Sequence, residues 1–107
     1  PTTARAGLTA FSRALAPEVI KDGVTINNLL PEMVETDRLT QLAADSARRT
    51  GLSPEEVRTR MMKRIPAGRF GDKDEFAAMC AFMCSAQAGY ITGQNIQIDG
   101  GSYPGLI

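Results

Sequence analysis

Two cysteines carry the thiols of this chain, and their spacing limits the chemistry available to them. Cys80 and Cys84 lie four positions apart, and the sequence contains no histidine. A redox pair favours the closer Cys-x-x-Cys spacing, and a zinc site needs further sulfur or imidazole ligands. We therefore expect two buried, reduced cysteines, no metal site and a cytoplasmic location.

Basic side chains are concentrated between residues 40 and 71. That segment has seven basic and three acidic residues, a net charge of +4, and the rest of the chain carries −4. The basic residues are Arg48, Arg49, Arg58, Arg60, Lys63, Arg64 and Arg69. Because the total charge is zero, we expect neither nucleic-acid binding nor attachment to a membrane surface.

The first half of the chain predicts a helix followed by a strand. Apolar residues at steps of three and four from Leu8 to Val19 predict an amphipathic helix over 4–21, with Pro17 causing a kink or a break. The segment 24–30 is rich in β-branched and apolar residues, so it predicts a largely buried strand that ends at Pro31.

The second half predicts three helices and a strand. Two short helices lie between residues 32 and 70, and Ser53-Pro54-Glu55-Glu56 is a strong signal for the start of the second. A helix that begins at Asp72 should bury Phe76, Met79, Cys80 and Met83 and end at Gly89. The segment 90–98 predicts a strand, with residues 99–101 as a turn and Asp99 packed at the end of the sheet.

The size and composition fit one modest α/β domain. The chain has 107 residues, of which 43% are hydrophobic, and its longest apolar run is nine residues, too short to span a bilayer. The sequence begins without Met or an apolar leader. We expect a truncated or processed amino terminus.

Four motifs in the same order resemble the carboxyl-terminal part of a short-chain dehydrogenase/reductase. They are Ala6-Gly7-Leu8, Gly23 to Asn27 with Pro31, Ile65 to Gly71, and Tyr90 to Gly101. The resemblance covers nearly all of the chain and implies part of a Rossmann-type, doubly wound parallel sheet that binds NAD or NADP, NADP slightly favoured. The implied activity is hydride transfer between nicotinamide and a carbonyl or alcohol substrate, with 3-oxoacyl-(acyl-carrier-protein) reductases as one candidate.

The resemblance also locates the positions of the catalytic residues. The family's Tyr and Lys positions fall at Pro1 and Arg5. Pro1 has no ionisable side chain, and Arg5 is a candidate for holding cofactor ribose but not for proton relay. The Gly-rich phosphate-binding turn and the strand with the catalytic Ser are not among these residues. We therefore expect the 107-residue piece alone to be inactive, and to be part of a longer polypeptide or stabilised by another chain.

A second family segment, Pro-Gly-x-Val/Ile-x-Thr, contacts the nicotinamide and reads here as residues 31–36. Pro31, Val34 and Thr36 match, so the resemblance implies that they bind the cofactor. Glu32 replaces the glycine, which adds a negative charge and restricts the backbone. Thr36 is equally suited to cap the next helix, and both roles can hold at once.

The segment of about 35–65 takes the place of the family's substrate lid. Its basic residues form either a solvated helix face or a surface for an anionic substrate, such as an acyl group on a phosphopantetheine or coenzyme A carrier. The resemblance implies a homo-dimer or homo-tetramer. Two alternatives stay open: a non-catalytic remnant of the family that acts in binding or assembly, and an unrelated α/β module that binds partners through a basic helix.

Overall fold

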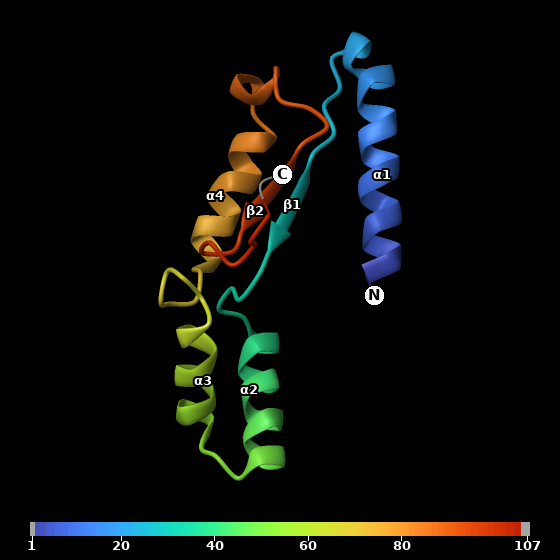
Figure 1. Ribbon diagram of the computed structural model, residues 1–107. Helices are drawn as coiled ribbons and strands as arrows, with labels where there is room; N and C mark the ends of the chain where they lie inside the picture. The colour runs from blue at the N-terminus through green and yellow to red at the C-terminus, as the bar shows by residue number, and fades with distance from the viewer. Residues whose placement is uncertain (1, 106–107) are drawn as a thin grey trace. The chain divides into compact units, whose positions relative to one another are not determined.

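The computed structural model describes residues 2–105, which form helices and a two-stranded sheet (Figure 1). In chain order the elements are α1 (Thr2–Val19), β1 (Asn28–Pro31), α2 (Asp37–Thr50), α3 (Pro54–Lys63), α4 (Lys73–Met83) and β2 (Asn95–Ile98), with short 3₁₀ helices at Ile20–Asp22 and Ala86–Ala88. The chain divides into two compact units. The sheet unit comprises Pro1–Leu30 and Ala77–Gln97, and the hairpin unit comprises Pro31–Phe76 and Ile98–Ile107.

The two strands pair in parallel, which confirms the predicted α/β class. The Asn28 N–H donates to the Gln94 carbonyl at 2.8 Å, and four residues further along the Glu32 N–H donates to the Ile98 carbonyl at 3.1 Å. Partners that advance together along both strands are the mark of a parallel pair. This sheet is a fragment of the doubly wound architecture.

Both strands are shorter than predicted. The segment 24–27 lies outside β1. Its Ile26 carbonyl accepts from the Gly93 N–H at 2.7 Å, and side chains make its other bonds to the segment before β2. The Ile26 N–H donates to Thr92 Oγ1 at 3.0 Å, and the Asn27 amide donates to the Ile91 carbonyl at 3.0 Å. Residues 24–30 are also exposed or half-buried, so the expectation of a largely buried strand is wrong.

Helix α1 continues through Pro17 and ends two residues later at Val19, so the proline does not break it. The predicted apolar face is not buried within the chain. Leu8 is 61% exposed and Phe11 is 64% exposed. The buried residues of α1 are the small Ser12 and Ala16.

Helices α2 and α3 form a hairpin with its own core (Figure 1). Ser53 Oγ accepts from the Glu56 N–H at 3.2 Å and begins α3, as the sequence predicted. Gly51 ends α2 in the left-handed region at φ +74°. The core residues of the hairpin unit are Leu39, Ala43, Ala47, Val57, Ile65 and Phe70.

The start of α4 is as predicted, but the burial of its apolar residues is not. The Asp74 N–H donates to Asp72 Oδ1 at 2.9 Å, and the Asp72 N–H donates to Glu75 Oε2 at 2.8 Å, a reciprocal capping box. The helix ends at Met83 rather than at Gly89.

The expectation of buried thiols is wrong. Cys80 and Cys84 are both free and exposed, and Phe76, Met79 and Met83 are only half-buried. The reason is that no part of residues 2–105 fully covers the apolar face of α4. The described helices include none that is long and apolar enough to cross a membrane.

Candidate functional site

The segment 31–36 joins β1 to α2 and lines a pocket. Pro31, Val34 and Thr36, the three residues predicted to bind a cofactor, lie together on the wall of a cavity of about 220 Å³. Lys73 and Phe76, at the start of α4, complete the lining. The structure therefore brings these three predicted residues to one site.

A short parallel bridge holds Val34 against Gly71. The Glu35 N–H donates to the Gly71 carbonyl at 2.8 Å, and the Gly71 N–H donates to the Met33 carbonyl at 3.0 Å. Because neighbouring residues of extended chain direct their backbone groups to opposite sides, the N–H and C=O of Val34 face away from Gly71. No hydrogen bond among the described residues uses these two groups.

Thr36 is the N-cap of α2, as predicted. Its Oγ1 accepts from the Leu39 N–H at 3.2 Å, with Thr36 itself in an extended conformation. A hydroxyl that accepts through a lone pair still has its own hydrogen to donate. The capping role leaves Thr36 able to donate a hydrogen bond to a ligand.

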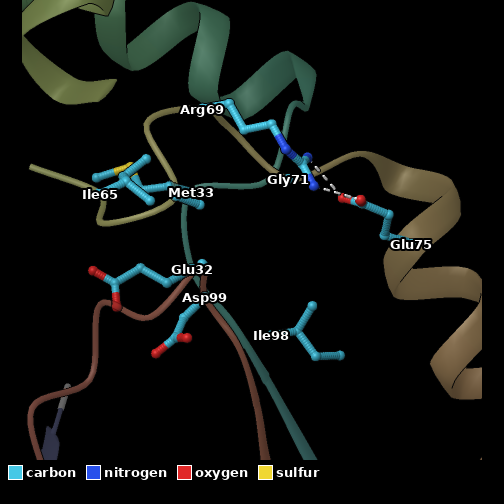
Figure 2. Close-up of a pocket in the computed structure, with 10 residues that line it drawn as sticks. Glu32, Met33, Ile65, Arg69, Gly71, Glu75, Ile98 and Asp99 are labelled. Carbon is cyan, nitrogen blue, oxygen red and sulfur yellow. Dashed lines mark hydrogen bonds and ion pairs between the residues drawn. The ribbon is translucent and has the colours of Figure 1, made fainter. Parts of the chain in front are cut away.

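Glu32 is among the residues that line a second, smaller pocket of about 70 Å³ (Figure 2). Asp99 lines the same pocket, and Glu32 is not among the residues that line the pocket of Val34 and Thr36. The residue with an unusual backbone conformation in this segment is the next one along the chain. Met33, not Glu32, occupies the left-handed region, at φ +53°.

An ion pair that the sequence did not predict borders the same small pocket (Figure 2). Two guanidinium nitrogens of Arg69 donate to the two carboxylate oxygens of Glu75, at 3.0 and 2.7 Å. The hydrogen bonds from Arg69, and next the one from the Asp72 N–H, lower the pKa of Glu75 to about 2. The Glu75 carboxylate in turn raises the pKa of Arg69. The capping-box spacing identifies Glu75, but no short spacing rule links it to Arg69.

The Asp99 carboxylate closes the turn after β2. It accepts from the Gly101 N–H at 3.0 Å and from the Tyr103 N–H at 2.8 Å, and Asp99 is buried. The segment 99–101 is therefore a turn that follows the strand, as predicted, and it opens no helix.

Two further positions were predicted from the resemblance. Arg5 is an exposed residue of α1, in the sheet unit, and a role for it beside the segment 31–36 stays a prediction. Pro1 lies outside the described residues.

Comparisons with known proteins agree on one family. A family model described as enoyl-(acyl carrier protein) reductase matches residues 2–103. The 3-oxoacyl-[acyl-carrier-protein] reductase FabG of Vibrio cholerae is 39% identical over 100 residues, which are 94% of this chain and 36% of that protein. The chain thus spans little more than a third of the length of this curated relative.

Solved structures show the same relationship. YwfH, an NADPH-dependent reductase involved in bacilysin biosynthesis, superposes with a TM-score of 0.86 at 32% identity, over 94% of this chain and 38% of its own. The L-sorbose reductase of Gluconobacter frateurii, solved with NADPH and L-sorbose, gives a TM-score of 0.88 at 30% identity, over 97% and 40%. The chain therefore belongs to the enoyl-(acyl carrier protein) reductase family of short-chain dehydrogenase/reductases.

Proposed function

We propose that this chain supplies the nicotinamide-facing segment and the substrate lid of an NAD(P)-dependent oxidoreductase. The reaction is hydride transfer between the nicotinamide and a carbonyl or alcohol substrate. The observation that carries this proposal is the placement of Pro31, Val34 and Thr36 on one pocket wall. These are the positions at which the chain keeps the family's cofactor segment.

The groups on this wall fit a nicotinamide carboxamide. The N–H and C=O of Val34 offer one donor and one acceptor without a partner among the described residues, and a primary amide needs one of each. The Thr36 hydroxyl adds a second donor. Glu32, which the sequence placed beside the cofactor, lines the other pocket and is not among the residues of this wall. When bound, the cofactor supplies or accepts the hydride.

The choice of cofactor and of substrate class follows the names of the relatives. NADP is favoured over NAD because two solved neighbours are named with NADPH. A 3-oxoacyl group on an acidic carrier is the favoured substrate, because the curated relatives are named for it. Exposed basic residues of the hairpin unit support an anionic partner; among them are Arg48, Arg49, Arg60, Lys63 and Arg64.

We do not propose that these 107 residues catalyse the reaction by themselves. Arg5 is proposed to hydrogen-bond the cofactor ribose, and no described residue is assigned as the proton donor. A lid over about 35–65, a homo-dimer or homo-tetramer and a cytoplasmic location stay predictions. The exposed Leu8 and Phe11 of α1 support assembly with another surface.

The test is a fluorescence titration of the full-length polypeptide with NADPH and with NADH. We expect saturable binding that is tighter for NADPH. Thr36→Val should weaken NADPH binding about tenfold through the loss of one hydrogen bond. Thr59→Val, on the exposed side of α3, is the matched control and should leave binding unchanged. Absence of binding to either cofactor would favour a non-catalytic member of the family.

A further inference from the structure

A half-buried arginine of α3 contacts two separate parts of the hairpin unit. The Arg58 side chain is 29% exposed, and its Nη2 lies 2.5 Å from Glu35 Oε2. The central carbon of the same guanidinium lies 4.8 Å from the centre of the Phe70 ring, which is a cation–π contact. Neither contact was predicted from the sequence, because both join segments that are separated along the chain; Arg58 is 23 residues from Glu35.

Both contacts flank the bridge that holds the proposed cofactor segment. Glu35 follows Val34, and Phe70 precedes Gly71, while Val34 and Gly71 are the bridged residues. Arg58 therefore contacts Glu35 on one side of the bridge and Phe70 on the other. A flat guanidinium can make an ion pair at its edge and stack through its face at the same time.

The ion pair also determines where the Glu35 charge lies. Side chains alternate along extended chain, so Glu35 is directed opposite to Val34 and Thr36. This agrees with the pocket wall, which includes Val34 and Thr36 but not Glu35. The carboxylate is thus held away from the wall and neutralised by Arg58.

We propose that Arg58 is a positioning residue for cofactor binding: it fixes the segment 33–36 from behind, through Glu35 and Phe70, and so couples helix α3 of the lid to the nicotinamide-facing wall. This inference rests on the proposed function. Arg58 touches neither cofactor nor substrate. It acts by holding the backbone groups of Val34 and the hydroxyl of Thr36 in register.

The test measures NADPH affinity of the full-length polypeptide by fluorescence, together with KM and kcat for an uncharged 3-oxo ester at saturating NADPH. Arg58→Met should raise the Kd for NADPH about tenfold, because a small displacement of positioning groups is costly. Arg58→Lys should raise it about threefold, because lysine keeps the charge but not the planar fork. The KM for the ester should change less than about twofold, because in this proposal Arg58 acts on the cofactor segment and not on the substrate.

The matched control is Thr59→Val, at an exposed residue next to Arg58 on the same helix, which should leave the Kd within about twofold of the parent. If Arg58 acts through Glu35, then Arg58→Met should have a much smaller effect in a Glu35→Gln background. Should Arg58→Met not fold, Arg58→Lys and this background give the same comparison.

The two proposals fail in different ways. If the parent protein binds no NADPH, the proposed function is overturned. If the parent binds NADPH but Arg58→Met and Arg58→Lys bind it equally well, only the positioning role is overturned. An equal effect of Arg58→Met with and without Glu35→Gln would also overturn it, because the ion pair would then not carry the effect.

Discussion

The two compact units differ in what they bury. The hairpin unit encloses large apolar side chains, among them Leu39, Ile65 and Phe70. The hydrophobic residues that the sheet unit buries are both alanines, Ala16 and Ala88, while its large apolar side chains on α1 are exposed. The hairpin unit thus completes a core from its own residues, and the sheet unit does not.

The difference follows from how far apart the contacting segments are in the sequence. Helices α2 and α3 are joined by a turn of three residues, so their apolar faces meet with little loss of chain entropy. The strands β1 and β2 are separated by more than sixty residues, and polar side chains such as Asn27 and Thr92 secure their ends. An apolar face that stays uncovered in such a unit is available to other surfaces.

The largest effect should come from truncating the core of the hairpin unit. Leu39→Ala should cost about 2–5 kcal/mol of unfolding free energy, because Leu39 is 4% exposed and its removal leaves a cavity. Leu42→Ala, on the same helix at a residue that is 46% exposed, should cost less than about 1 kcal/mol. Urea unfolding followed by circular dichroism measures both.

The same substitution in the sheet unit could break the comparison. Leu8→Ala should be as mild as Leu42→Ala, because Leu8 is exposed. If Leu8→Ala lowers the unfolding free energy by several kcal/mol, another surface covers α1 in solution. The difference in burial between the two units would then hold only for the chain by itself.

A second prediction concerns two glycines of the hairpin unit that share a left-handed backbone. Gly51 has φ +74° and Gly100 has φ +62°, but a Cβ on Gly51 would meet no atom within 4 Å, whereas on Gly100 it would lie 2.8 Å from Ile65 Cγ2. Gly51→Ala should cost about 1 kcal/mol for backbone strain alone. Gly100→Ala should cost about 2–3 kcal/mol, since it also disturbs the core residue Ile65.

Thermal unfolding in the presence of a fixed denaturant concentration ranks these variants. Equal costs for the two glycines would mean that the turn after β2 moves freely against Ile65. That result would remove one of the contacts by which the hairpin unit closes its core.

Local signals in the sequence predicted the helix starts well. Ser53, Thr36 and the pair Asp72 and Glu75 all cap helices as expected, because a cap involves residues no more than three positions apart. The burial of the α4 face was predicted wrongly. An apolar stripe predicts which face of a helix will be buried. Residues 72–84 do not indicate whether another part of the chain buries that face.

The candidate site was predicted in part. Motif spacing identified Pro31, Val34 and Thr36, which share one pocket wall. It did not identify the left-handed Met33 or the contacts of Arg58, because these depend on where distant segments meet. The residues of a family motif follow a pattern in the chain, and the residues that contact them from distant segments do not.

A third prediction separates capping from cofactor binding. Ser53→Ala and Thr36→Ala each remove one side-chain cap and should each cost about 1 kcal/mol of stability. The proposed function adds a loss of NADPH affinity for Thr36→Ala but none for Ser53→Ala. Thr36→Ser keeps the hydroxyl and should restore both properties. Equal NADPH affinity in all three variants would leave Thr36 with the cap alone.

The smallest effect should come from the ion pair at the rim of the hairpin unit. Arg69 and the Asp72 N–H lower the pKa of Glu75 to about 2 in the folded chain, from an ordinary value of 4.5. A folded-state pKa below the unfolded one means that the ionised carboxylate stabilises the fold. Its contribution is therefore complete above about pH 5 and is lost as the pH falls from there toward 2. Because the pair is exposed, the effect should be small and should weaken with added salt.

Glu75→Gln measures this contribution with little other disturbance, because the glutamine carbonyl can still accept from the Asp72 N–H and keep the cap. The stability of the parent minus that of Glu75→Gln should be positive near neutral pH and approach zero near pH 2. Arg69→Gln should remove the same pH dependence, since Arg69 is the main cause of the lowered pKa. A difference that stays constant with pH would assign the stabilising role of Glu75 to its cap, a contact within one turn of helix. The hairpin unit would then owe its stability to its apolar core and helix caps, with no measurable share from this exposed pair.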